Sequence, residues 1–405
     1  MYKVLSNIIN QARNKEKSET TEIVLISLLK YGFSSALCLF QIYIPIYLKN
    51  NGISGGQIGI LTSVFTISAL FLSAPVGIWN DKFSSKKLIL FSVIGLALFI
   101  TGFIFNISFW YFLLVFLLGG ISRNLFNISS RSLVMKKIGT GNEKNNSSQK
   151  IGIFNAGGQL AYGVTGAIGG LIISIYGFSM VFVIALLICG FIFLTSFIIQ
   201  DEEIEADTID LSAYKGDLLS KEFLVIAVLV MGFGFHAGVE KTSFSLFLKS
   251  LNITEYKIGI ILAMIGITMT LTSIYSGKLI DRFFSDNSQY SLKTWFIGAL
   301  ILSAVGNIAF AFSKGFYSAF FIRFLHVVGD AVFFVILWTS ASKIFDVKKY
   351  GGASGIVSLL FVTGITIGAL LSGALGDIYG FNFSFILAGL ITLTALPIMK
   401  IQNQG

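Results

Sequence analysis

The sequence holds only two histidines, and each stands four residues before a carboxylic acid: His236 before Glu240, and His326 before Asp330. A spacing of four places both members of a pair on one face of an α-helix. Both pairs lie inside long apolar runs, where an ionisable side chain is costly and usually functional. A desolvated carboxyl group beside a histidine can bind and release a proton. The pairs therefore predict a proton-coupling site made of Asp330, Glu240, His326 and His236.

Four basic residues also lie within apolar runs: Lys30, Arg123, Lys241 and Arg323. Lys30 stands near the end of its run, from which a lysine can reach the membrane surface. We expect Arg123, Arg323 and Lys241 to face a central cavity, where they contact substrate or pair with the acids. The alternative is that the buried charges form an ion-pair network that only holds the helices together. Proton coupling is favoured because such a network would not require both histidines of the chain.

The elements that must position these residues are membrane-spanning helices. The 405 residues are 55% hydrophobic and only 12% charged, whereas soluble domains are roughly 25% charged. The apolar runs are continuous and long enough to span a bilayer as helices, which excludes an alternating β-barrel. Two cysteines, Cys38 and Cys189, lie in apolar runs and are expected to be buried free thiols. Twelve runs are expected to span the membrane: 23–48, 55–79, 88–105, 109–135, 150–175, 178–199, 223–248, 255–277, 294–313, 316–342, 351–376 and 380–399.

The net charge of +9 is a topology signal and does not indicate nucleic-acid binding. If the N-terminus is inside, the termini and the loops after even-numbered spans hold 21 Lys and Arg, and the other side holds four. Basic residues concentrate on the cytoplasmic side of membrane proteins. We therefore expect both termini to be cytoplasmic, in the cell membrane, and the first span to direct insertion without a cleaved signal peptide.

The sequence repeats itself at a shift of 200 residues. The shift aligns Lys49, Ile58 and Gly59 with Lys249, Ile258 and Gly259, and places Ser54 and Thr254 as helix N-caps. It also pairs Arg123 with Arg323. Near the fifth and eleventh spans the shift is 203, where Gly177 matches Gly380. Six spans therefore form one unit that occurs twice in the same orientation.

The repeat predicts two pseudo-symmetric six-helix bundles. The predicted parts are a cytoplasmic segment 1–22, an N-terminal bundle 23–199, an acidic cytoplasmic linker 200–221, a C-terminal bundle 222–400 and a tail 401–405. In transporters with such repeats the substrate site lies between the halves near the middle of the bilayer.

The loop after the second span carries Gly77, Asp81, Lys82 and Lys86, and this pattern resembles the loop signature of major facilitator superfamily permeases. Gly277, Asp281 and Arg282 echo it in the second half. Ser84 and Ser85 replace a glycine and an arginine of the signature. The resemblance covers nearly the whole chain and implies a cavity lined by the first, fourth, seventh and tenth spans. It also implies that the seven loop residues form a cytoplasmic gate, which closes through contacts made in one state only.

These observations favour a secondary active transporter that moves a small solute by alternating access and is coupled to protons. Three alternatives are a uniporter or organic-anion carrier that uses Arg123 and Arg323, a divalent-metal carrier, and a non-transporting receptor of the same fold. Lys241 argues against metal transport. Uptake and export both remain open, because the fifth span has Gly166, Gly169 and Gly170 but lacks the proline of the antiporter signature. We expect no enzymatic activity, cofactor or metal, and a monomer whose partners are a small molecule, protons and the lipid bilayer.

The charge bias predicts that cysteines introduced at Ser212, in the linker, and at Ser288, after the eighth span, are shielded from membrane-impermeant thiol reagents in intact cells. Labelling after permeabilisation serves as the control. Labelling of either position from outside would contradict the predicted topology.

Overall fold

The computed structural model describes residues 21–82, 84–105, 108–140, 154, 158, 160–199, 220–285, 289–344, 350–394 and 396. At residues 73–74, 77–78, 80–82, 135–140, 221–222, 278–285, 289–293, 338–344 and 350–356 it describes the backbone only.

All the regular structure in these residues is helical. The chain forms a first helix, Thr21–Cys38, and then α2 (Ile44–Asn50), α3 (Gly55–Lys82), α4 (Ser85–Thr101), α5 (Phe109–Thr140), the π-helical turn η2 (Ala161–Thr165), α7 (Gly166–Ser196), α9 (Lys221–Ser250), α10 (Glu255–Ser285), α11 (Gln289–Phe310), α12 (Phe316–Ile344), α13 (Tyr350–Tyr379) and α14 (Phe381–Leu393). Eight segments are long and apolar enough to cross a membrane. One of these, Ala161–Ser196, contains two spans that meet at Gly177, where φ is 78°.

Shorter apolar helices account for the remaining spans. They are α4, with 17 residues, the segment Thr294–Phe310 of α11, and α14. Together with the long segments they agree with twelve crossings, so the chain is an all-α, multi-pass membrane protein.

The two sequence repeats have the same turns. Gly52 has φ 82° and Asn252 has φ 56° in the turns before α3 and α10, and both positions lie in the left-handed region. Gly177 and Gly380, with φ 78° and 88°, make the turn before the sixth and twelfth spans. The shifts of 200 and 203 therefore correspond to equivalent backbone positions.

The predicted N-caps are present in both halves. Ser54 Oγ accepts a hydrogen bond from the Gln57 amide at 3.2 Å, and the Gln57 side chain accepts one from the Ser54 amide at 3.0 Å. This reciprocal pair is a capping box at the start of α3. Thr254 Oγ1 accepts from the Lys257 amide at 3.5 Å at the start of α10.

The first span differs from the continuous helix expected over 23–48. Helix Thr21–Cys38 ends in turns over residues 39–43, and α2 begins at Ile44 with Pro45 in its first turn. A proline has no amide hydrogen, and its ring clashes with the carbonyl four residues earlier. The helix is therefore broken, and the break lies beside the cavity described below.

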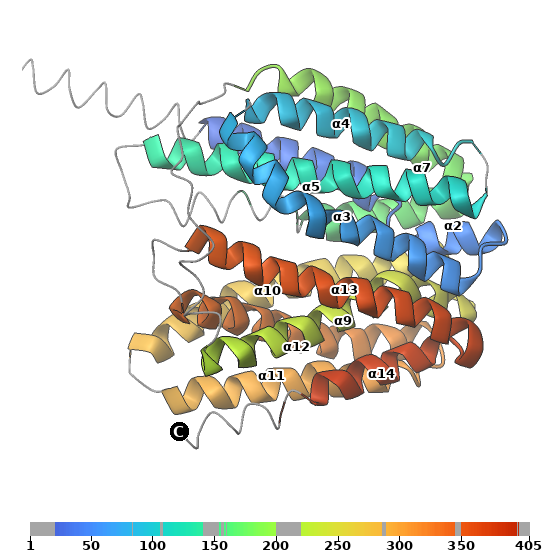
Figure 1. The fold of residues 1–405 in the computed structure, drawn as a ribbon. Coiled ribbons are helices and arrows are strands. Elements are labelled where there is room, and N and C mark those ends of the chain that lie inside the picture. The colour runs from blue at the N-terminus through green and yellow to red at the C-terminus, as the bar shows by residue number, and fades with distance from the viewer. Residues whose placement is uncertain are drawn as a thin grey trace, which may run out of the picture.

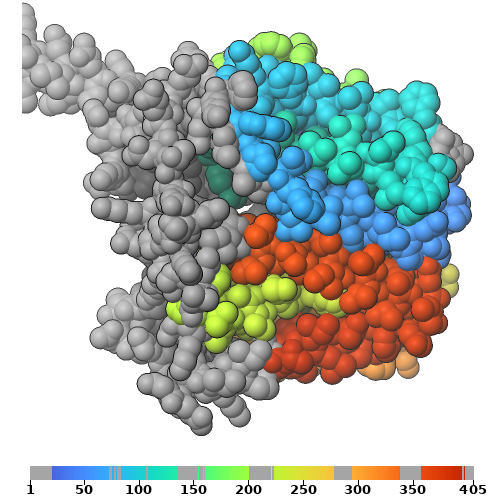
Figure 2. Space-filling model, viewed as in Figure 1, coloured from blue at the N-terminus to red at the C-terminus, as the bar shows by residue number. Residues whose placement is uncertain are grey.

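The helices form two bundles, one above the other in Figure 1. The first helix and α2 to α7 make the N-terminal half, and α9 to α14 make the C-terminal half. Figure 2 shows α3 of one half lying directly against α13 of the other. A second contact between the halves joins η2 and α7 to α10.

Small residues allow these contacts. A Cβ on Gly59 would lie 2.6 Å from the Ala369 carbonyl oxygen, and one on its repeat partner Gly259 would lie 2.8 Å from the Ala167 carbonyl oxygen. Ser63 Oγ donates to the Thr366 carbonyl at 2.9 Å across the α3–α13 contact. Larger side chains at the two glycines would force the halves apart.

A polar contact closes the end of the molecule that carries α2. Lys49 Nζ donates to Asp377 Oδ1 at 2.9 Å, and the Gly56 amide donates to Asp377 Oδ2 at 2.8 Å. Asp377, at the end of α13, thus binds the N-terminus of α3 in the other half, where a carboxylate is favoured. The described polar and glycine contacts between the halves lie in the part of the helices next to α2. The halves are therefore closed at this end.

Replacing Asp377 by Asn should weaken this closure, because it removes the ion pair and the charge at the N-terminus of α3. We expect a cysteine introduced at Thr366 to react several-fold faster with a small thiol reagent in the Asp377→Asn variant. Glu255→Gln is the matched control, because Glu255 pairs with Lys249, at 2.8 Å, within one half. Equal rates in the two variants would contradict a closing role for Asp377.

Candidate functional site

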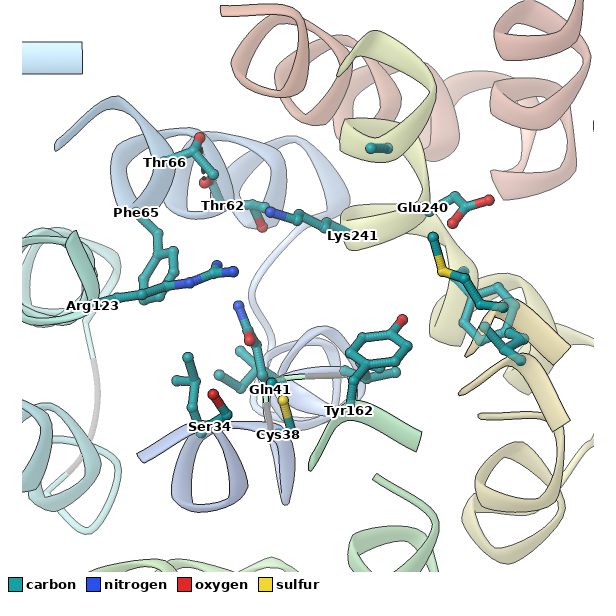
Figure 3. A pocket seen from close by; sticks show the side chains of 18 of the residues that line it. Ser34, Cys38, Gln41, Thr62, Phe65, Thr66, Arg123, Tyr162, Glu240 and Lys241 are labelled. Atoms are coloured by element: carbon teal, nitrogen blue, oxygen red, sulfur yellow. Dashed lines mark hydrogen bonds between the residues drawn. The ribbon is translucent and has the colours of Figure 1, made fainter. Parts of the chain in front are cut away.

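A cavity of about 500 Å³ lies between the two halves. Helices of both halves line it, and aromatic rings make up much of its wall. Its polar and charged lining residues are Lys30, Ser34, Cys38, Gln41, Thr62, Thr66, Arg123, Asn127, Tyr162, His236, Glu240, Lys241, Arg323 and Asp330. Figure 3 shows several of them turned toward the same space. Glu240, Asp330, Arg123, Arg323 and Lys241 all line this cavity, and so does Lys30. Their roles in coupling and substrate binding stay predictions.

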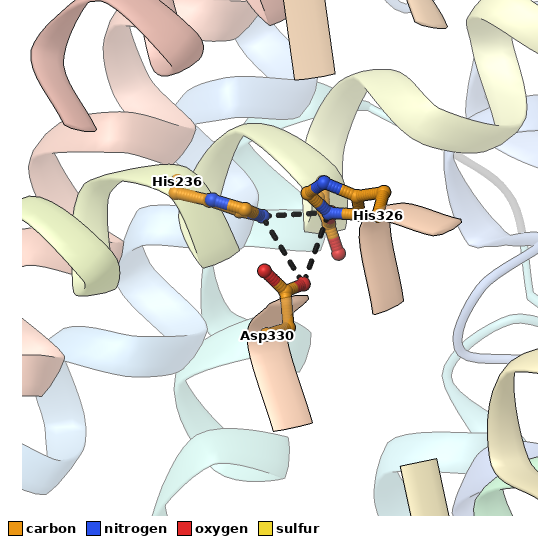
Figure 4. A group of neighbouring side chains, drawn as sticks. His236, His326 and Asp330 are labelled. Atoms are coloured by element: carbon orange, nitrogen blue, oxygen red, sulfur yellow. Dashed lines mark hydrogen bonds and ion pairs between the residues drawn. The ribbon is translucent and has the colours of Figure 1, made fainter. Parts of the chain in front are cut away.

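The two histidines and two acids meet on the C-terminal side of the cavity. His326 Nε2 lies 2.9 Å from Asp330 Oδ2 and 3.2 Å from Glu240 Oε1. His236 Nε2 lies 2.9 Å from the same Glu240 oxygen and 3.6 Å from Asp330 Oδ2. The imidazole rings stack with their centres 4.9 Å apart, and both are turned toward the Asp330 carboxylate (Figure 4). Helices α9 and α12 thus bring the two i, i+4 pairs into one cluster.

Hydrogen bonds from α11 fix the orientation of the cluster. The Ser303 hydroxyl donates to Asp330 Oδ1 at 2.6 Å, and the Ser303 carbonyl lies 2.8 Å from His326 Nδ1. A carbonyl can only accept, so His326 Nδ1 carries a hydrogen and donates it. Asn307 Nδ2 lies 3.1 Å from His236 Nδ1, and His236 Nε2 faces Glu240 Oε1 at 2.9 Å.

These hydrogen positions require one further proton in the cluster. With its hydrogen on Nδ1, a neutral His326 would turn the Nε2 lone pair toward oxygens of Asp330 and Glu240. Such a contact is favourable only if His326 Nε2 or one of the carboxyl groups carries a further proton. His326 is fully buried, so no water replaces that proton. The short contact between His326 Nε2 and Asp330 Oδ2 can therefore hold a shared proton.

Glu240 has a separate partner for its charge. Arg323 Nη1 lies 2.6 Å from Glu240 Oε1, and the guanidinium lies 5.0 and 5.3 Å from the ring centres of Phe244 and Phe310. The sequence suggested Lys241 as a partner for Glu240, but adjacent helical residues diverge. Figure 3 shows Lys241 pointing toward Thr62 on α3, away from the Glu240 carboxylate.

Close packing of α11 on α12 positions the cluster. A Cβ on Gly306 would lie 2.7 Å from His326 Cβ, and one on Gly329 would lie 2.7 Å from the Ser303 amide nitrogen. Only glycine at these positions lets Ser303 reach both His326 and Asp330. Sequence reasoning missed Ser303 and Asn307, although their spacing of four within an apolar run is the same signal that identified the histidine pairs.

Arg123 does not correspond to Arg323 in depth, contrary to the alignment at a shift of 200. Arg123 stands 14 residues after the first residue of α5, and Arg323 stands seven residues after the first residue of α12. The offset of seven residues is about 10 Å along a helix. Helices α5 and α12 begin at Phe109 and Phe316, which are 207 residues apart, so a single shift of 200 cannot hold throughout. Arg123 lies over the Phe65 ring, 5.8 Å from its centre, on the N-terminal side of the cavity.

The predicted cytoplasmic gate is described only in part. The side chains of Asp81, Lys82, Asp281 and Arg282 lie outside the described residues, and so do the surroundings of Gly77. Among the described residues, none lies within 4 Å of a Cβ built on Gly277. Lys86 Nζ donates to the Phe197 carbonyl at 2.7 Å. The gating role of these seven residues stays a prediction.

The cluster also has the composition of a metal site. One atom from each of His236, Glu240, His326 and Asp330 lies within 4.8 Å of the others. However, the Arg323 guanidinium is held against the same Glu240 oxygen that would bind the ion. A divalent cation there would have to displace it or lie beside a fixed positive charge. The donor set fits a proton better than a metal ion.

Comparison with known proteins identifies the family. The family model described as Major Facilitator Superfamily matches residues 24–289 and 241–401. The chain belongs to the major facilitator superfamily, a family of transporters. The predicted family, the all-α fold of two six-helix bundles and the absence of an enzymatic role are confirmed.

Two relatives illustrate the likeness in sequence. The quinolone resistance protein NorA of Staphylococcus aureus is 27% identical over 371 residues, which cover 89% of this chain and 91% of NorA. An uncharacterised MFS-type transporter of Methanocaldococcus jannaschii is 25% identical, over 88% of this chain and 92% of the relative.

Two solved structures have the same fold at low sequence identity. The nucleoside transporter NupG has a TM-score of 0.74 and 17% identity, over 96% of this chain and 100% of NupG. A bacterial homologue of the lysosomal transporter Spinster, inward-facing and unoccupied, has a TM-score of 0.75 and 13% identity, over 95% and 96% of the two chains.

The packing of α11 on α12 generates a prediction for Gly306→Ala. The added methyl group would meet His326 backbone and Cβ atoms, so we expect a loss of about 1 to 3 kcal/mol of stability. The melting temperature of the purified protein should fall by several degrees. Gly298→Ala on the same helix is the matched control, because no atom of the described residues lies within 4 Å of its Cβ position. Equal melting temperatures for the two variants would contradict the packing role of Gly306.

Proposed function

We propose that this protein is a proton-coupled secondary active transporter of small amphipathic molecules, which works by alternating access in the cell membrane with both termini in the cytoplasm. The observation that supports the proposal is the short contact between His326 Nε2 and Asp330 Oδ2, which can hold a shared proton at the border of the central cavity. The 21 to 4 bias in basic residues supports the orientation.

The charges of the cluster explain why the proton is exchangeable. The Arg323 charge offsets that of Glu240, and the shared proton offsets that of Asp330. Loss of the proton leaves one uncompensated negative charge in an apolar surrounding, which is unfavourable until water or another charge reaches it. Glu240 and Asp330 line the cavity, so the proton can leave only toward the side to which the cavity is open.

Alternation requires that the contacts between the halves open and close. At the α2 end the halves are held together by the ion pair between Lys49 and Asp377. Close packing at glycines adds to this, where α3 meets α13 and where η2 and α7 meet α10. With cytoplasmic termini this end faces outside, so the structure corresponds to a state closed to the exterior. Separation of these contacts, together with closure at the opposite end, would expose the cavity to the exterior.

We propose export as the direction. The likeness to NorA, named as a resistance protein, supports it, and the cavity wall suits flat, apolar molecules. Rings from both halves line the cavity: Phe33, Phe65, Phe99, Phe116, Phe233, Phe244, Phe334 and Phe361. In this scheme protons enter as substrate leaves.

Asp330→Asn should abolish gradient-driven transport, because the amide cannot take up or release the shared proton. In vesicles containing the purified protein, a quinolone should accumulate under an imposed pH gradient with the wild type and not with the variant. Exchange of labelled for unlabelled compound at equal pH on both sides should persist, since exchange does not require the proton to leave.

Glu255→Gln, which removes a carboxylate remote from the cluster, should accumulate the compound like the wild type. Substitution of His326 should shift the pH profile of transport and weaken coupling. Normal accumulation by both Asp330→Asn and Glu240→Gln would reject proton coupling through this cluster and leave a uniporter.

A further inference from the structure

The cavity has a second charged region, opposite the proton-binding cluster. Arg123 on α5 and Lys241 on α9 both line the cavity, one from each half. In Figure 3 the Arg123 guanidinium and the Lys241 side chain extend toward the space between α3 and α9, and Lys241 ends near Thr62. Two positive groups thus face one space from opposite halves.

The described acids that line the cavity are already engaged by groups other than Arg123 and Lys241. Glu240 is engaged by Arg323 and both histidines, and Asp330 by Ser303 and His326. The ion pairs of Glu255 and Asp377 are with Lys249 and Lys49 at the α2 end. The described contacts of Arg123 are with the Phe65 ring, and for Lys241 no ion pair or hydrogen bond is found among the described residues. Like charges that share a poorly hydrated space without a counter-charge are unfavourable.

The neighbouring groups suit an anionic ligand with an apolar body. Tyr162 and Gln41 border the same space as Arg123 and Lys241 and can donate hydrogen bonds (Figure 3). Tyr162 belongs to η2, a π-helical turn within an otherwise α-helical span, and such turns are frequent at functional sites. Gln41 lies in the break of the first span, before Pro45. The aromatic wall adjoins these donors.

We propose that Arg123 and Lys241 form an anion-binding subsite, which holds the carboxylate of an amphipathic aromatic substrate. The inference deepens the proposed function and rests on it, because it names the substrate class of the same cavity. A carboxylate there would bridge the halves through charge-assisted hydrogen bonds. It would also lie away from the proton-binding cluster, with Lys241 and Glu240 on diverging faces of α9. Substrate and proton could then occupy the cavity at different places.

The test compares binding of aromatic carboxylic acids with binding of their primary amides. A panel of naphthoic, quinolone and biphenyl carboxylic acids, each beside its amide, is titrated into the purified full-length protein without any gradient. The wild type should bind at least one acid about tenfold more tightly than its amide, as expected for charge-assisted contacts. The ratio of the dissociation constants of the amide and the acid should fall to near unity in Lys241→Met and in Arg123→Gln.

Controls separate charge from folding. Lys241→Arg should keep the preference, and Lys257→Met, which removes a lysine near Phe316 outside the cavity, should keep it too. Melting temperatures verify that each variant is folded, and if Arg123→Gln is unfolded the Lys241 variants decide. The subsite would be overturned if the wild type bound no acid more tightly than its amide. It would also be overturned if the preference for the acid survived in Lys241→Met.

Failure of the subsite and failure of the proposed function give different results. Binding without a gradient does not depend on coupling, so Asp330→Asn should retain the preference for the acid. If Asp330→Asn loses coupling but the wild type shows no preference for any acid, only the subsite is rejected. If the wild type prefers an acid and Asp330→Asn accumulates the compound normally, only proton coupling is rejected.

Discussion

A proton shared between His326 and Asp330 is the interaction on which the proposed transport cycle depends. In water either group could gain or lose a proton at little cost. Here His326 is fully buried and Asp330 is 7% exposed, so a charge without a partner is expensive. The surrounding helices therefore fix the number of protons that the cluster can hold while it is closed to water. In the proposed cycle, that restriction links proton movement to the state of the cavity.

The architecture supplies both the restriction and its release. Within the C-terminal half, Gly306 and Gly329 bring α11 and α12 close enough for Ser303 to hydrogen-bond both His326 and Asp330. Between the halves, glycines in α3 and α10 allow tight contact without long interlocking side chains. Tight packing within a half and separable packing between halves are the physical requirements of two rigid bundles that rock. The polar contact of Asp377 adds a specific closure at the α2 end.

Much of this organisation can be predicted from the sequence. Apolar run lengths identify the spans, and the repeat at 200 residues predicts equivalent turns, seen at Gly52 and Asn252. The i, i+4 histidine pairs locate the cluster because helix geometry alone puts each pair on one face. Contacts between helices distant in sequence are not encoded in such spacings. The pairing of Arg323 with Glu240 and the support from Ser303 and Asn307 depend on helix rotation, which a periodic pattern does not fix. The break after Cys38 could have been inferred from Pro45.

The number of protons moved per substrate molecule tests proton coupling through the cluster most directly. Vesicles containing the purified protein are loaded with substrate and a pH indicator, and the pH gradient at which net substrate flux reverses is measured at several substrate gradients. We predict that the reversal point shifts with the pH gradient, and that this dependence disappears when Asp330 is replaced by Asn. A flux that reverses only where the substrate concentrations are equal, whatever the pH gradient, would contradict proton coupling.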